Sequence, residues 1–201
     1  MSTIQVVLFL PCFMVFLFFF WRRLKEDMRA EFLFGGGLLL GGLGLLALVA
    51  SIILESSYWF WMVNVGFFGG MLLAVWKYRM RFFESLEAFV VGTFAFWTGW
   101  FWFSAPIGGR WVGVVQGTFF LVLICLFFVF DRRYKAFSWY RSGKIGFSGL
   151  SVLGVFFVAR AVVAVVSPNM LSFVGRFEAI VSGLLAFLVF FLLYNLAQEK
   201  T

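Results

Sequence analysis

The stretch GVFFVARAVVAVV, from Gly154 to Val166, decides the fold class of this chain. Twelve of its thirteen residues are apolar or glycine, and the remaining one is Arg160. The same apolar run extends back to Ile145, and a helix needs about 20 such residues to cross the hydrocarbon core of a bilayer. We therefore predict a transmembrane helix that carries a permanent cation within it.

The composition extends this interpretation to the whole chain. Of its 201 residues, 64% are hydrophobic and 12% are charged, whereas soluble domains carry about 25% charged residues. The formal net charge of +7 could suggest a nucleic-acid partner. However, the basic residues lie in short blocks between apolar runs, where they orient helices in a membrane. We predict an integral membrane protein and no nucleic-acid binding.

Apolar runs of spanning length recur along the sequence. We predict an all-α, polytopic membrane protein that forms a single transmembrane domain over residues 1–201. Its spans are expected at about seven places, namely Ile4 to Trp21, Phe32 to Leu54, Tyr58 to Trp76, Ala88 to Phe103, Val112 to Phe130, Ile145 to Val166 and Glu178 to Tyr194.

The charges between the spans predict the orientation. Basic residues are concentrated in three connections, at 22–31, 77–84 and 131–144. In the connections between these, the only basic residues are Arg110 and Arg176. Loops rich in lysine and arginine stay on the cytoplasmic side of a membrane. We therefore expect the N-terminus outside and the C-terminus in the cytoplasm.

This orientation predicts the depth of Arg160 in the membrane. It lies six residues before Val166, about 9 Å from the outer end of its helix at 1.5 Å per residue. A charge at such a depth is costly and points to a functional site by default. The alternative is that Arg160 extends to the outer headgroups and only anchors the helix.

Further polar residues lie toward the predicted outer side and could join Arg160. Three arginines on one side suit a phosphate, because the planar guanidinium binds phosphate oxygens in a bidentate manner. An anionic lipid headgroup is the expected ligand. No nucleotide cofactor is predicted, because the glycines lie in apolar spans without a preceding strand. No metal site is predicted either. The polar set comprises Glu55, Asn64, Arg110, Gln116, Thr118, Arg176 and Glu178.

The order of these features resembles the prolipoprotein diacylglyceryl transferase family over nearly the whole chain. The shared features are seven spans, a glycine-rich second span, a GG in the third, a short amphipathic piece RFFESLEAF before the fourth, and an arginine late in the sixth. The family pattern H-G-G-L-L-G-G is similar to NVGFFGG, with Asn64 at the histidine and Gly66 kept. The family's D-A is similar to Glu87 and Ala88.

Later motifs match in the same partial way. The signature G-R-I-G-N-F resembles FWTGWF, in which Gly99 is kept and Trp97 stands at the arginine. The Q-L-Y-E motif resembles VQGT, with Thr118 at the glutamate. The R-x-x-x-E motif resembles RAVVA, with Arg160 kept and Ala164 at the glutamate. The final G-Q resembles Gly175 and Arg176, so the glycines survive better than the polar positions.

The resemblance implies transfer of a diacylglyceryl group from phosphatidylglycerol to the lipobox cysteine of a prolipoprotein, at the outer face of the bacterial cytoplasmic membrane. Arg160 and Asn64 would be the catalytic residues, although asparagine cannot act as the base that the thiol requires. Glu55, Glu178 or solvent could remove that proton. The residues implied in substrate binding are Arg176, Arg110, Gln116, Thr118, Gly66 and Gly99.

Two alternatives stay open beside this hypothesis. The chain could be a catalytically silent homologue that binds phospholipid or the signal peptides of prolipoproteins. It could also be an unrelated small transporter or assembly subunit, in which Arg160 pairs with a substrate or with a partner helix.

Overall fold

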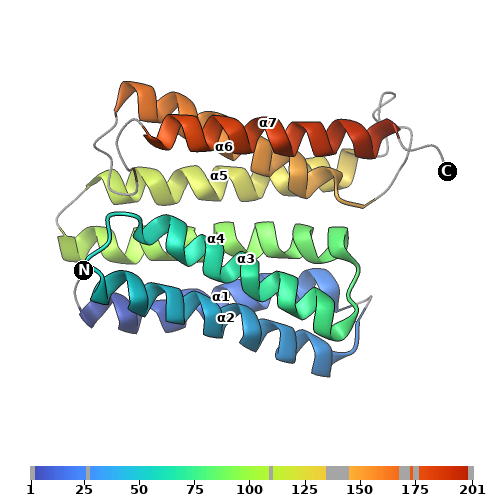
Figure 1. Cartoon of the computed structure of the whole chain (residues 1–201), viewed down its shortest axis with the longest axis horizontal. Coiled ribbons are helices and arrows are strands. Elements are labelled where there is room, and N and C mark those ends of the chain that lie inside the picture. The colour runs from blue at the N-terminus through green and yellow to red at the C-terminus, as the bar shows by residue number, and fades with distance from the viewer. Residues whose placement is uncertain are drawn as a thin grey trace. The chain divides into compact units, whose positions relative to one another are not determined.

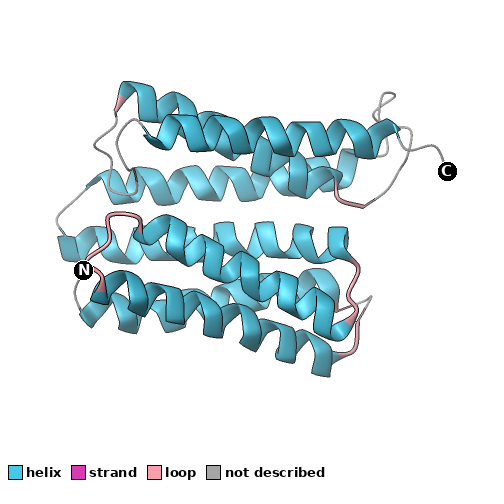
Figure 2. Cartoon of the chain, viewed as in Figure 1, coloured by secondary structure: helices cyan, strands magenta, loops and turns pink. Residues whose placement is uncertain are grey.

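The computed structural model describes residues 3–25, 28–108, 111–134, 145–167, 173 and 177–198. Over these residues the regular secondary structure is helical throughout (Figure 2). Seven helices lie in the described part of the chain, and all are long and apolar enough to cross a membrane. They are α1 (Thr3–Leu24), α2 (Ala30–Ile53), α3 (Trp59–Tyr78), α4 (Phe82–Gly108), α5 (Trp111–Arg133), α6 (Phe147–Val166) and α7 (Phe177–Gln198).

Each predicted span corresponds to one of these helices, so the prediction of a multi-pass helical protein is confirmed. The fourth span differs in length. The segment RFFESLEAF was expected as a separate amphipathic piece, but Phe82 onward forms the first turns of α4 itself. These turns bury Glu84 and Glu87. Arg81 pairs with Glu84 at 2.9 Å and Arg23 of α1 pairs with Glu87 at 2.6 Å, which compensates both carboxylates.

The chain forms two compact units, Met1–Leu121 and Val122–Thr201. The first contains α1 to α4 and the start of α5, and the second contains the rest of α5 with α6 and α7 (Figure 1). The boundary falls inside α5, which is one continuous helix. The prediction of a single transmembrane domain over residues 1–201 stays a prediction.

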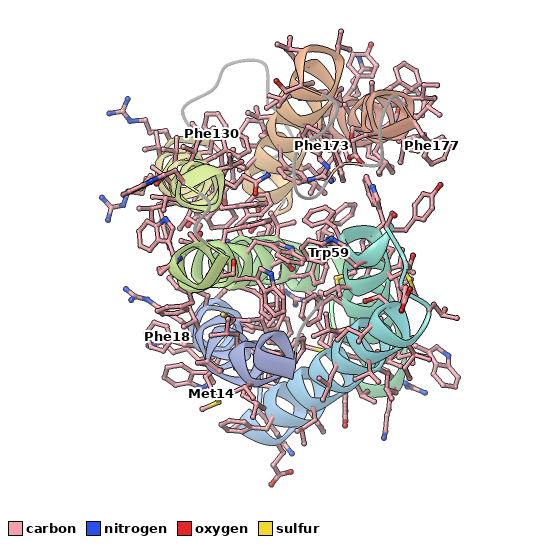
Figure 3. All side chains as sticks on the ribbon, turned by 90° about the vertical axis from the view of Figure 1, so that its left-hand side faces the viewer. Met14, Phe18, Trp59, Phe130, Phe173 and Phe177 are labelled. Atoms are coloured by element: carbon pink, nitrogen blue, oxygen red, sulfur yellow. The ribbon has the colours of Figure 1, made fainter. Side chains whose placement is uncertain are left out.

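Within the first unit, α1 packs on α4 through phenylalanine rings. Phe9, Phe13 and Phe16 recur at a helical spacing on one face of α1 and are buried. Phe16 stacks on Phe67 of α3 with a centroid distance of 5.6 Å. The opposite face carries Met14 and Phe18, which are exposed and point outward in Figure 3. The exposed face is apolar, as expected of a surface that faces lipid.

The contact between α2 and α3 depends on glycine. A Cβ atom added at Gly70 would lie 2.6 Å from Leu40 Cα and 2.8 Å from the Leu39 carbonyl oxygen. One added at Gly66 would lie 2.6 Å from the Leu43 carbonyl oxygen. The two backbones therefore touch where any side chain would be too large, which is how small-xxx-small spacing joins helices in a bilayer.

Candidate functional site

Arg160 is buried in the second unit, on the sixth helix. Its side chain is 4% exposed, although α6 is otherwise apolar around it. The snorkelling alternative requires the guanidinium to reach the surface, and the structure places it in the protein interior instead. The charge must therefore be compensated from inside the protein.

The compensating group is Glu178, in the first turn of α7. The Nε–H of Arg160 donates a short hydrogen bond to Glu178 Oε1, and the Glu178 side chain is fully buried. The Ser182 hydroxyl donates to the same carboxylate oxygen at 3.0 Å, and Ser182 is also fully buried. The three side chains form one hydrogen-bonded network between α6 and α7.

Two aromatic rings border the guanidinium. Arg160 Cζ lies 4.7 Å from the ring centre of Phe173 and 6.0 Å from that of Phe156. Phe156 precedes Arg160 by one helical turn, whereas Phe173 comes from the connection that leads to α7. Arginine stacks favourably on aromatic faces, and the attraction is stronger where water is excluded. The rings thus contribute to holding the cation between the helices.

Local sequence explains why this network can form. Ser182 follows Glu178 by four residues, so the two side chains share one face of α7. On α6, Ala164 lies one turn beyond Arg160 and is buried. Gly154 lets α7 approach further along α6, since a Cβ there would lie 2.7 Å from the ring of Phe190.

Asn64 lies in the first unit and has its own partners. Its Nδ2 donates to the Phe60 carbonyl oxygen at 2.7 Å, and its Oδ1 accepts from Trp97 Nε1 at 3.2 Å. Trp97 is buried against Phe60 with a centroid distance of 4.7 Å. Asn64 and Trp97 are the positions that the sequence analysis compared with the histidine and the signature arginine of the diacylglyceryl transferases. The two side chains are hydrogen-bonded to each other.

The remaining predicted site residues have varied positions. Gly66 lies at the α2–α3 contact described above, and Gly99 lies where a Cβ would come 3.3 Å from Cys12 Sγ of α1. Gln116 and Thr118 lie in the first turns of α5, and the Thr118 hydroxyl donates to the Val114 carbonyl oxygen at 2.8 Å. Their predicted roles in substrate binding stay predictions.

Two predicted arginines, Arg110 and Arg176, fall outside the described residues. The structure therefore brings together Arg160 and Glu178 from the predicted set, and it adds Ser182, which the sequence analysis missed. A signal for the pair existed, because a cation within an apolar helix requires a nearby anion. Glu178 is the first carboxylate that follows Arg160 in the sequence.

The described residues contain no group of three or more histidine, cysteine, aspartate or glutamate side chains that could hold a metal ion. In the network, a guanidinium is held by a carboxylate and lies beside two rings, and a hydroxyl donates to the carboxylate. No known family model, no curated protein and no solved structure matches this chain.

Proposed function

We propose that this protein handles anionic phospholipid in the bacterial cytoplasmic membrane, as a divergent relative of the diacylglyceryl transferases that its sequence resembles. The observation that carries the proposal is the buried Arg160, which keeps a guanidinium deep in an apolar helix and fixes its position through α7. A phosphate diester is the ligand that a fixed, planar and permanently charged group suits best.

In the proposed reaction, the thiolate sulfur of a lipobox cysteine attacks the carbon of the diacylglyceryl group that carries the phosphate in phosphatidylglycerol. A carbon–sulfur bond forms, the carbon–oxygen bond to the phosphate breaks, and glycerol phosphate leaves with its charge. Arg160 stabilises the charge on this leaving group, which is the kind of electrostatic contribution that is often the largest in an enzyme. The thiol proton passes to solvent.

The test is direct. Purified protein is incubated with phosphatidylglycerol and a lipobox peptide, and mass spectrometry is used to look for the diacylglyceryl adduct on the peptide cysteine. We expect the adduct with the unmodified chain and its loss in Arg160→Lys, since lysine keeps only the charge. Arg29→Lys is the matched control, because Arg29 is exposed at the start of α2 in the other unit.

A catalytically silent homologue is the second candidate, and one observation favours it. Both amide atoms of Asn64 are engaged by Phe60 and Trp97, and a neutral amide does not accept a proton from a thiol at neutral pH. In that case the folded protein retains phosphatidylglycerol in native mass spectrometry but forms no adduct. Absence of both adduct and retention would contradict the two candidates together.

We further propose that the N-terminus lies outside and the C-terminus in the cytoplasm, on the basis of the basic connections. Single cysteines at Ser57 and Lys25, in a chain with Cys12 and Cys125 replaced by alanine, test this in intact cells. An impermeant thiol reagent should label position 57, between α2 and α3, and not position 25, after α1. The reverse pattern would overturn the orientation.

A further inference from the structure

The Arg160 network has a property that anion binding alone does not require, which is that an anion of the protein already occupies it. The Glu178 carboxylate accepts the Arg160 Nε–H, and neither side chain is more than 4% exposed. The charge of the guanidinium is therefore compensated before any ligand arrives.

A carboxylate and a phosphate bind arginine through the same N–H groups and in the same planar geometry. An ionised Glu178 in contact with Arg160 also repels a second anion strongly, because the water that would screen the repulsion is excluded from a buried site. A lipid phosphate can thus bind Arg160 closely only if the carboxylate gives up its place or its charge.

We propose that Glu178 is an internal counter-ion that occupies Arg160 until the phosphate of an anionic ligand replaces it. This inference rests on the proposed function, in which Arg160 binds a lipid phosphate. The carboxylate holds Arg160 in the ligand-free protein. A ligand must therefore bind Arg160 more strongly than Glu178 does, and a neutral or weakly bound ligand does not displace the carboxylate.

Ser182 provides a hydrogen bond that the Glu178 carboxylate can keep during the exchange. Its hydroxyl donates to Glu178 Oε1 from one turn further along α7, and Ser182 is fully buried. A carboxylate that leaves Arg160 therefore keeps one hydrogen bond from its own helix, which lowers the cost of leaving the cation. The rings of Phe173 and Phe156 stay beside the guanidinium throughout, since their attraction is to the cation and not to its anion.

The experiment compares phospholipid retention by native mass spectrometry among Glu178→Gln, Glu178→Asp and the unmodified chain, at matched amounts of folded monomer. Glutamine keeps the shape and an acceptor oxygen but removes the charge, so phosphatidylglycerol should be retained about tenfold more tightly or better, within the usual range of coupling between sites. Aspartate keeps the charge on a shorter stem, and its retention should lie between the other two. It serves as the test if the glutamine variant fails to fold.

Controls identify the ligand and the site. Glu31→Gln changes an exposed carboxylate at the start of α2 and should leave retention unchanged. Phosphatidylethanolamine, which has no net charge, should gain little from Glu178→Gln. Inorganic phosphate is added as a competitor. If it displaces the lipid from Glu178→Gln, free phosphate also exchanges with Glu178; if it does not, the exchange is specific to the lipid.

The outcomes separate this inference from the proposed function. Equal or weaker retention of phosphatidylglycerol by folded Glu178→Gln and Glu178→Asp would overturn the counter-ion role and make Glu178 a support that Arg160 needs for binding. The double variant Arg160→Met/Glu178→Gln tests the underlying function. If it retains phosphatidylglycerol as well as Glu178→Gln does, the lipid is not bound at Arg160 and the proposed site is wrong. If it loses the lipid, the gain in Glu178→Gln belongs to Arg160.

Discussion

Two helix pairs of this protein are joined in opposite ways. In the α2–α3 pair, the two backbones meet where Gly66 and Gly70 provide space, and the nearest atoms there belong to leucine and alanine. The α6–α7 pair also has a glycine, Gly154, but the buried network of Arg160, Glu178 and Ser182 joins the last turns of α6 to the first turns of α7. Without a hydrophobic driving force between helices in lipid, close packing and polar contacts are the two means of association that remain.

The difference teaches what each contact is suited to do. A backbone contact through glycine has a single geometry and no group that a ligand could bind. A buried ion pair adds little net stability, because the desolvation of both charges offsets most of their attraction. Its presence in α6–α7 therefore needs another reason, and the proposed recognition of a phosphate supplies one.

The largest effect is expected from removing one charge of the network. Arg160→Met leaves the Glu178 carboxylate buried without its cation, and breaking a buried pair in this way typically costs about 3 to 5 kcal/mol. Arg160→Met/Glu178→Met removes both charges and should restore much of the loss. Thermal unfolding in detergent measures both variants. Equal losses in the single and double variants would contradict this prediction, because removing the unpaired carboxylate would then recover no stability.

The next effect concerns the backbone contact. Gly70→Ala places a Cβ against Leu40 Cα and the Leu39 carbonyl oxygen, which cannot move as a side chain can, and we expect a loss of about 1 to 3 kcal/mol. Gly69→Ala is the matched control, because nothing lies within 4 Å of a Cβ there. It should be neutral or slightly stabilising, since alanine favours the helix by about 0.5 to 1 kcal/mol. Equal melting temperatures for the two variants would contradict the close α2–α3 contact.

A smaller effect is expected at Ser182. Ser182→Ala removes one hydrogen bond to Glu178 and keeps the ion pair, so the loss should be near the average of about 0.6 kcal/mol for such bonds in membrane proteins. Ser56→Ala, at an exposed turn before α3, is a comparison outside the network. Thermal unfolding in detergent compares the stability losses of Ser182→Ala and Ser56→Ala. A loss in Ser182→Ala as large as that of Arg160→Met would show that the ion pair requires Ser182.

The smallest effect should come from Gly154→Ala. The three atoms nearest to the added Cβ all belong to the ring of Phe190, and Phe190 is 40% exposed, so its side chain can turn aside. We expect a change within about 0.5 kcal/mol, as for substitutions away from the tightest contacts. A smaller stability loss in Gly154→Ala than in Gly70→Ala would show that backbone atoms limit the space at α2–α3, whereas a movable side chain does so at α6–α7. A loss matching that of Gly70→Ala would mean that α6 and α7 also depend on an immovable contact.

The fold was predictable because span length and hydropathy depend on local sequence. The apolar run that contains Arg160 has the length that a bilayer demands, and α6 ends at Val166 as expected. The start of α4 was misjudged because Glu84 and Glu87 made its first turns look amphipathic. Glu84 has a local partner in Arg81, but Glu87 is paired with Arg23, which is 64 residues away in the sequence, and no local pattern contains that second partner.

The site was predictable only in part, for a related reason. Arg160 stood out as a cation in an apolar helix, but its environment depends on how α7 folds back against α6. Glu178 was considered as a base and as one of several outward polar groups, and its role as the partner of Arg160 follows only from the packing. The bond between Asn64 and Trp97 likewise joins helices α3 and α4, at residues 33 apart.

The pairing of Arg160 with Glu178 also bears on how the chain enters the membrane. Alone, α6 would carry an arginine into the lipid at a cost of about 2.5 to 3.5 kcal/mol or more. The neighbouring α7 brings the neutralising carboxylate and a hydroxyl with it. Insertion of the two helices together, as a hairpin, avoids an intermediate in which the lone cation faces lipid. The residue pair at the proposed ligand site thus also favours one order of assembly over another.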